Sequence, residues 1–163
     1  MAIARQPEMP AGPPPAPPVP AAVVSCHGGC GATAVARMLP AREIQRDQLA
    51  VGEAPLVLVA RGTAYGLHWA TRGVAFAHQH IEHGWLAAPP LLVLVADSAL
   101  REPSTVRARV RLIEDRVQTV VRLPYVSAWR DTDDPLTIPQ PKQLVEPLEQ
   151  LRAELAATTG VPA

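Results

Sequence analysis

Four short runs of apolar residues alternate along the chain with segments whose apolar residues recur at helical spacing. The apolar runs predict buried strands, at residues 21–26, 56–60, 91–96 and 119–123. The segments between them predict helices at 32–39, at 41–50, at about 65–83 and after Pro103. Apolar strands that alternate with helices favour an α/β fold of three layers, with a mostly parallel sheet of about four to five strands.

The spacing of the apolar residues also predicts which face of each helix is buried. In the segment 41–50, Ile44 and Leu49 face inward, whereas the charged residues, Glu43 and Arg46 among them, face solvent. The long helix has its apolar face at Leu67, Ala70, Val74, Ala77 and Ile81. The helix after Pro103 has its apolar face at Val106, Val110 and Ile113.

The two ends of the chain differ in composition from its middle. Residues 1–20 contain eight of the 19 prolines, which predicts an extended, disordered tail. Residues 131–163 begin with an acidic, proline-containing linker and continue as a helix with one leucine face, at Leu144, Leu148, Leu151 and Leu155. We therefore expect one folded domain at 21–130, between a proline-rich tail and an acidic linker with an amphipathic helix.

A turn with three glycines follows the first strand and precedes the first helix, in the sequence Cys26-His27-Gly28-Gly29-Cys30-Gly31-Ala32-Thr33. In this context, backbone N–H groups can converge on a phosphate. Ligands of parallel sheets bind at the carboxyl ends of the strands. Those ends carry the glycine turn, residues 61–63, Asp97-Ser98 and Pro124-Tyr125.

The stretch from His27 to Thr33 resembles the deviant Walker A motif of the ParA/MinD branch of P-loop ATPases, which reads Lys-Gly-Gly-x-Gly-Lys-Thr after a strand. The three glycines and the threonine align, but His27 and Ala32 stand where the family has its two lysines. Asp97 resembles the residue that reads the nucleotide base, and residues 123–125 resemble the family's Ile-Pro-like turn. Residues 124–130 are also similar to the Pro-Trp…Trp-Arg ending of short uncharacterised P-loop-like proteins of actinobacteria.

This resemblance implies a P-loop NTPase-like fold that takes ATP or GTP with Mg²⁺. The implied nucleotide site comprises His27, Gly28, Gly29, Cys30, Gly31, Ala32, Thr33, Asp97 and Pro124, with Thr33 as the Mg²⁺ ligand. Asp97 also fits a Walker-B-like acid, and the sequence does not decide between the two roles. Phosphoryl transfer depends on neutralised charge, so loss of both lysines implies weak binding and little hydrolysis. The expected function is that of a degenerate P-loop protein, a pseudo-ATPase with no catalytic residue and a regulatory or scaffolding role.

An active NTPase is the alternative reading of the same loop. In that case the missing positive charge would come from Arg61, from Arg130 or from a partner chain. A zinc-binding module is a second alternative, because Cys26, His27 and Cys30 could join His78, His80 and His83 as ligands. However, the last three histidines cannot converge from one straight helix.

Charge and composition bear on the partners. The chain has 15 positive and 15 negative side chains, so no global field attracts nucleic acid or a membrane surface. The arginines between 101 and 130 are spread around their helix without interleaved aromatic residues, and we do not expect nucleic acid binding. We expect a protein partner that contacts the proline-rich or the acidic tail. The acidic tail could also fold back on the basic segment, or meet it in a homodimer.

The two cysteines indicate the compartment. A disulfide between Cys26 and Cys30 would distort the glycine turn, which favours a reduced, cytoplasmic protein. No apolar run approaches the roughly 20 residues that span a bilayer, and the first residues lack the apolar stretch of a signal peptide.

Overall fold

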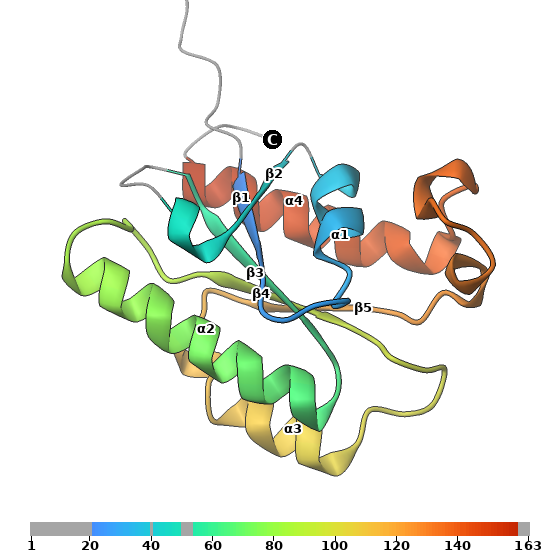
Figure 1. Cartoon of the computed structure of the whole chain (residues 1–163), viewed down its shortest axis with the longest axis horizontal. Coiled ribbons are helices and arrows are strands. Elements are labelled where there is room, and N and C mark those ends of the chain that lie inside the picture. The colour runs from blue at the N-terminus through green and yellow to red at the C-terminus, as the bar shows by residue number, and fades with distance from the viewer. Residues whose placement is uncertain (1–20, 40, 50–53, 160–163) are drawn as a thin grey trace, which may run out of the picture.

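The computed structural model of the chain describes residues 21–39, 41–49 and 54–159. The predicted proline-rich tail at 1–20 lies outside the described residues, as do Pro40, residues 50–53 and residues 160–163. Helices lie on both sides of a central sheet, which is the predicted three-layer α/β arrangement (Figure 1).

Among the described residues, five strands form this sheet, and every pairing between neighbours is parallel. The strands are β1 (Ala21–Ser25), β2 (Ala41–Ile44), β3 (Leu56–Arg61), β4 (Leu91–Val95) and β5 (Val120–Leu123). Their order in space is β2-β1-β3-β4-β5. The expected mostly parallel sheet of four to five strands is therefore confirmed.

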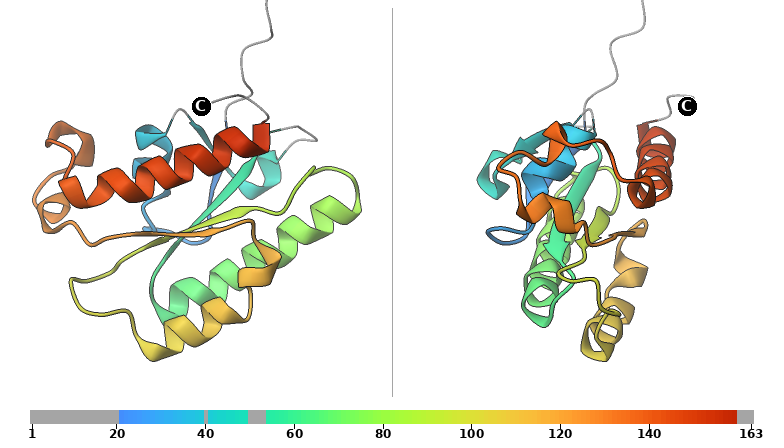
Figure 2. Two further views of the ribbon diagram at one scale, coloured as in Figure 1. Left: turned by 180° about the vertical axis from the view of Figure 1, so that it is seen from behind. Right: turned by 90° about the vertical axis from the view of Figure 1, so that its right-hand side faces the viewer.

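In the part of the chain that the structure describes, four α-helices cover the sheet, two on each face (Figures 1 and 2). One face carries α1 (Ala32–Met38) and α4 (Val145–Thr159), and the other carries α2 (Ala64–Glu82) and α3 (Ser104–Arg111). Side chains of a strand alternate between faces, so Val23 packs on the side of α1 and α4 and Val24 on the side of α2 and α3.

The predicted buried faces of the helices are largely confirmed. On α2, all of the predicted inward residues except Ile81 are fully buried, and Ile81 is partly buried. The three apolar residues predicted after Pro103 are buried against the same face of the sheet. Leu144, Leu148 and Leu151 are buried beside α1, and Leu155 packs partly against them. The leucine face of the last helix is thus part of the core of this sheet.

The helix predicted at residues 41–50 is wrong. Residues Ala41–Ile44 form β2, which pairs in parallel with β1, and only Arg46–Gln48 make a single 3₁₀ turn. An edge strand has one neighbour and one exposed side, so it tolerates the charged residues that we read as the solvent face of a helix. Ile44 does face the core as predicted, and Glu43 therefore points to the opposite side, that of α1.

Candidate functional site

The strand order reverses between β1 and β3, because the chain passes from β1 to β2 on one side and to β3 on the other. The loops that leave the carboxyl ends of two such strands diverge and leave a crevice, which is where doubly wound sheets bind ligands. Here those loops are the glycine turn, residues 26–31, and the turn at Gly62-Thr63. The structure thus places the glycine turn at this crevice, at a strand-to-helix junction.

Two glycines in the turn adopt backbone conformations that other residues avoid. Gly29 has φ of 70° and Gly31 has φ of 95°, in the left-handed region. Gly31 also caps the amino end of α1. The backbone N–H groups from His27 to Ala34 donate no hydrogen bond to any residue within 21–39, 41–49 and 54–159. The first backbone N–H after them that donates is that of Val35, to the Gly31 oxygen at 3.0 Å. The turn therefore presents consecutive N–H groups without protein acceptors.

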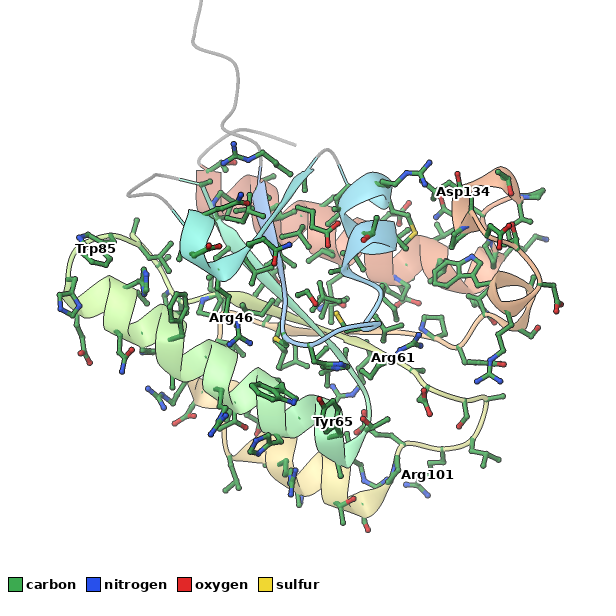
Figure 3. The ribbon with its side chains drawn as sticks, in the orientation of Figure 1. Arg46, Arg61, Tyr65, Trp85, Arg101 and Asp134 are labelled. Atoms are coloured by element: carbon green, nitrogen blue, oxygen red, sulfur yellow. The ribbon has the colours of Figure 1, made fainter. Side chains whose placement is uncertain are left out.

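Arg61, the last residue of β3, ties the turn to the neighbouring strand (Figure 3). Its Nε donates to the Gly29 oxygen at 3.1 Å, and its Nη1 donates to the Ala96 oxygen at 3.5 Å. The positive charge that sequence reading assigned to Arg61 therefore lies at the glycine turn. Arg130, the other arginine considered, instead has its guanidinium carbon 5.5 Å from the ring centre of Tyr125.

His27 links the same two strands through its ring. The Arg61 N–H donates to His27 Nε2 at 3.1 Å, so Nε2 is an acceptor and the ring proton resides on Nδ1. Nδ1 lies 3.0 Å from the Gly28 oxygen and can donate to it. In this tautomer His27 is neutral and holds the turn, so it does not replace the charge of a Walker A lysine.

A cavity of about 720 Å³ lies against the turn, within the range of about 300–1,000 Å³ that is usual for ligand sites. Its lining combines the turn and Thr33 with five charged side chains from four other parts of the chain. These are Arg37 on α1, Glu43 on β2, Arg61 on β3, and Asp133 and Asp134 after β5. A polar, charged cavity of this kind suits a phosphate-bearing ligand together with a divalent cation.

Sequence reasoning missed four of these residues. Glu43 was assigned to the outer face of a helix, and only the strand β2 turns it toward α1 and Thr33. Arg37 follows Thr33 by four residues, so helical spacing could have indicated that both face the cavity. No local pattern of residues indicates that Asp133 and Asp134 line the cavity, because they are about 97 positions along the chain from Arg37 on α1.

The acidic segment contacts α1 and not the basic segment at 101–130, as far as the described ion pairs show. Asp134 forms a bidentate pair with Arg37, at 2.8 and 3.0 Å. The hydrogen bond from Arg37, and a weaker one from the Leu136 N–H, lower the pKa of the Asp134 carboxyl. Within the basic segment, Arg122 pairs with Glu102 at 3.0 Å.

Asp97 and Pro124 line a second cavity, of about 580 Å³, at the ends of β4 and β5. Its walls include Leu94, Leu100 and Leu123, so it is mostly apolar, and the Asp97 carboxylate lies at its exposed margin. The structure therefore does not gather all predicted site residues in one place. The glycine turn and Thr33 belong to the first cavity, and Asp97 and Pro124 belong to the second.

The cysteines and histidines do not come together. Cys26 packs on the side of α2 and Cys30 on the side of α1, so their side chains lie on opposite faces of the sheet. Burial raises the pKa of the Cys26 thiol to about 12, which keeps it protonated. His78 Nε2 lies 2.7 Å from the Arg116 oxygen, and His80 packs against Trp85. In the described part of the chain, no three His, Cys, Asp or Glu side chains are grouped so that they could hold a metal ion.

Comparisons with protein-family models, with curated proteins and with solved structures found no match to this chain. Among the described helices, none has both the length and the apolar character that a membrane span requires.

Proposed function

We propose that this protein binds a nucleoside di- or triphosphate, with the phosphates in the glycine-turn cavity, and that it uses the bound state to regulate a protein partner. The observation that carries the proposal is the convergence of two anion-binding features on one cavity. The first is the run of N–H groups from His27 to Ala34 without protein acceptors. The second is the guanidinium of Arg61, fixed on the Gly29 oxygen. Successive free amides beside a cation form a concavity suited to phosphate.

Mg²⁺ fits the same cavity. Thr33 and Glu43 both line it, and both also line a neighbouring cavity of about 460 Å³ between α1 and β2. Mg²⁺ binds oxygen ligands and commonly takes one or two protein carboxylates, with phosphate and water oxygens completing its shell. The Thr33 hydroxyl and the Glu43 carboxylate are therefore the residues that would hold it, and Mg²⁺ would neutralise phosphate charge there.

The second cavity suits the base. It opens at the ends of β4 and β5, and its lining combines three leucines and three prolines, which suit the flat, apolar faces of a nucleobase, with five charged side chains that can bond the base edge. Arg61 lies between the two cavities, because it bonds the glycine turn on one side and the Ala96 oxygen on the other. A nucleotide bound over Arg61, with its phosphates in the first cavity, would place its base near Asp97. The family resemblance implied that Asp97 reads the base.

We further propose that binding occurs without efficient hydrolysis. Ala32 offers no charge to the terminal phosphates, and His27 is neutral because its Nε2 accepts the Arg61 N–H. Phosphoryl transfer requires cations that neutralise the developing charge, and Arg61 offers the turn one guanidinium where the motif that it resembles has two lysines. A binding protein of this kind acts through its partners, as expected of a pseudo-ATPase.

Calorimetric titration with ATP, ADP, GTP and GDP, with and without Mg²⁺, tests the proposal. We expect binding that strengthens with Mg²⁺. Glu43→Gln should remove most of the Mg²⁺ dependence, and Asp97→Asn should preserve it but alter the preference between bases. If Asp97→Asn instead removed the Mg²⁺ dependence, Asp97 would be the metal-side acid. If no nucleotide bound at millimolar concentration, the proposal would be wrong.

A working NTPase remains a second candidate, and the position of Arg61 is the observation that favours it. Its guanidinium lines the phosphate cavity, where a cation supplied in place of the lysines would act. Phosphate release that disappears in Thr33→Ala would support this candidate. Phosphate release that the substitution leaves unchanged would come from a contaminant and would contradict it.

A further inference from the structure

The segment at residues 131–139, here called the strap, lies against the glycine-turn cavity on the side of α1 (Figure 3). It is organised around Asp134, whose Oδ1 accepts the Leu136 N–H at 3.0 Å and so caps the 3₁₀ turn Pro135–Thr137. The Asp134 backbone oxygen accepts hydrogen bonds from Thr132 and Thr137. The strap is therefore a small pre-shaped unit that presents the Asp134 carboxylate to α1.

The Asp134 carboxylate forms an ion pair with Arg37, an arginine that lines the cavity. Both Asp134 oxygens accept from the Arg37 guanidinium, at 2.8 and 3.0 Å, in the fork-shaped geometry that arginine also uses for phosphate. Arg37 lies one helical turn after Thr33 and faces the same cavity. A phosphate at the glycine turn and the Asp134 carboxylate are therefore two anions that can use the same guanidinium.

The charges of the cavity are unfavourable to an anion while the strap is in place. Its lining has two arginines, Arg37 and Arg61, against three carboxylates, those of Glu43, Asp133 and Asp134. Withdrawal of the strap would remove two of these carboxylates and free Arg37. The lining would then carry a net positive charge, which favours phosphate.

The strap also leaves space between itself and the residues that it covers. A cavity of about 190 Å³ lies beneath it, lined by Met38, Trp129, Pro135, Leu136, Ile138, Gln140, Pro141 and Leu144. The Nε1 of Trp129 is buried without a hydrogen-bond partner among the described residues. Unfilled space forfeits packing energy, and the partly exposed Arg37–Asp134 pair is one of the contacts that attach the strap to the domain.

We propose that Asp134 is an internal competitor of the bound phosphate: it holds the strap closed on Arg37, and a phosphate that takes Arg37 releases the strap. This inference rests on the proposed function, because it names how that same site is regulated. The strap leads directly to α4, which begins at Val145. Its release therefore changes the surface that the carboxyl-terminal part of the chain offers to a partner protein.

The test measures inorganic pyrophosphate binding by calorimetry, and hydrogen exchange of peptides that cover residues 131–139. Asp134→Asn removes the competing charge, and we expect it to bind pyrophosphate at least about fivefold more tightly than the unmodified protein. Asp131→Asn is the matched control: it removes the same charge from the same segment, but Asp131 neither pairs with Arg37 nor lines the cavity. We expect it to change affinity by at most about twofold. Pyrophosphate should increase exchange of the strap in the unmodified protein, and Asp134→Asn should show that increase without ligand.

A double substitution guards against indirect effects. Arg37→Gln with Asp134→Asn should lose the gain in affinity, because the released guanidinium is then absent. Equal effects of Asp134→Asn and Asp131→Asn, or strap exchange that pyrophosphate does not change, would overturn the strap proposal while leaving the proposed function intact. If neither the unmodified protein nor Asp134→Asn bound pyrophosphate or any nucleotide, both proposals would fail.

Discussion

The two cavities at the carboxyl edge of the sheet differ in what builds them. The cavity at the glycine turn is made of backbone N–H groups and charged side chains from five separate parts of the chain. The cavity at the ends of β4 and β5 has no glycine turn, and its lining combines three leucines and three prolines with five charged side chains, those of Asp97, Arg101, Glu102, Arg122 and Glu146. Arg61 bonds a carbonyl oxygen beside each of them. The comparison suggests that one ligand with a charged end and an apolar end suits this edge better than two unrelated ligands.

We expect the largest effect from Gly66→Ala, because the added Cβ would disturb the backbone of Arg61, the residue between the two cavities. A Cβ on Gly66 would lie 2.0 Å from the Arg61 oxygen and 2.8 Å from its carbonyl carbon, so the backbone of Arg61 or the start of α2 must move. We expect Gly66→Ala to destabilise the fold by about 3 kcal/mol, as overpacking against backbone does. Chemical denaturation measures this change.

Gly28→Ala is the control for that experiment. Its Cβ would meet nothing within 4 Å, and its φ is not positive, so we expect a change within about 0.5 kcal/mol. Similar losses in the two variants would show that the backbone of Arg61 is not the rigid link between the cavities.

We expect the next largest effect from removing the positive charge of Arg61. Arg61→Gln keeps a donor but loses the cation, and we expect pyrophosphate to bind about tenfold more weakly, the loss of one charge-assisted hydrogen bond. Arg130→Gln removes the arginine that stacks on Tyr125, away from the glycine turn, and should change the affinity by less than about twofold. Calorimetry of both variants decides whether the cation of the first cavity is Arg61, and a larger loss in Arg130→Gln would contradict the site.

The smallest expected effect concerns Cys26, the buried first residue of the glycine turn. The pKa of the Cys26 thiol is raised from 9.0 to about 12 by burial. As the pH rises, the unfolded chain therefore loses this proton first, so the contribution to stability is complete below pH 9 and is lost between pH 9 and about pH 12. We expect a loss of about 1 kcal/mol by pH 10 that is missing from Cys26→Ala.

Denaturation curves at pH 8 and pH 10 measure this difference. Native Cys26 should also resist alkylation at pH 8, because little thiolate is present. If the unmodified protein and Cys26→Ala lost the same stability between pH 8 and pH 10, or if native Cys26 were alkylated rapidly, Cys26 would not be buried beneath the glycine turn.

Most of the elements could be predicted because each is marked by its own local pattern. The five-residue run at Leu91–Val95 became β4, and the apolar face of the long helix became the buried face of α2. Ala41–Ile44 could not be predicted in the same way. Its four residues are too few to separate helical from strand spacing, and only pairing with β1 makes it a strand.

The α/β alternation and the glycine turn follow from local patterns of residues. Buried strands need apolar residues throughout, and a left-handed backbone at Gly29 and Gly31 needs glycine. The surroundings of that turn depend on tertiary packing. Glu43 reaches it through the register of an edge strand, and Asp134 reaches it from the far end of the chain. Such contacts depend on how distant segments pack, which no local pattern of residues encodes.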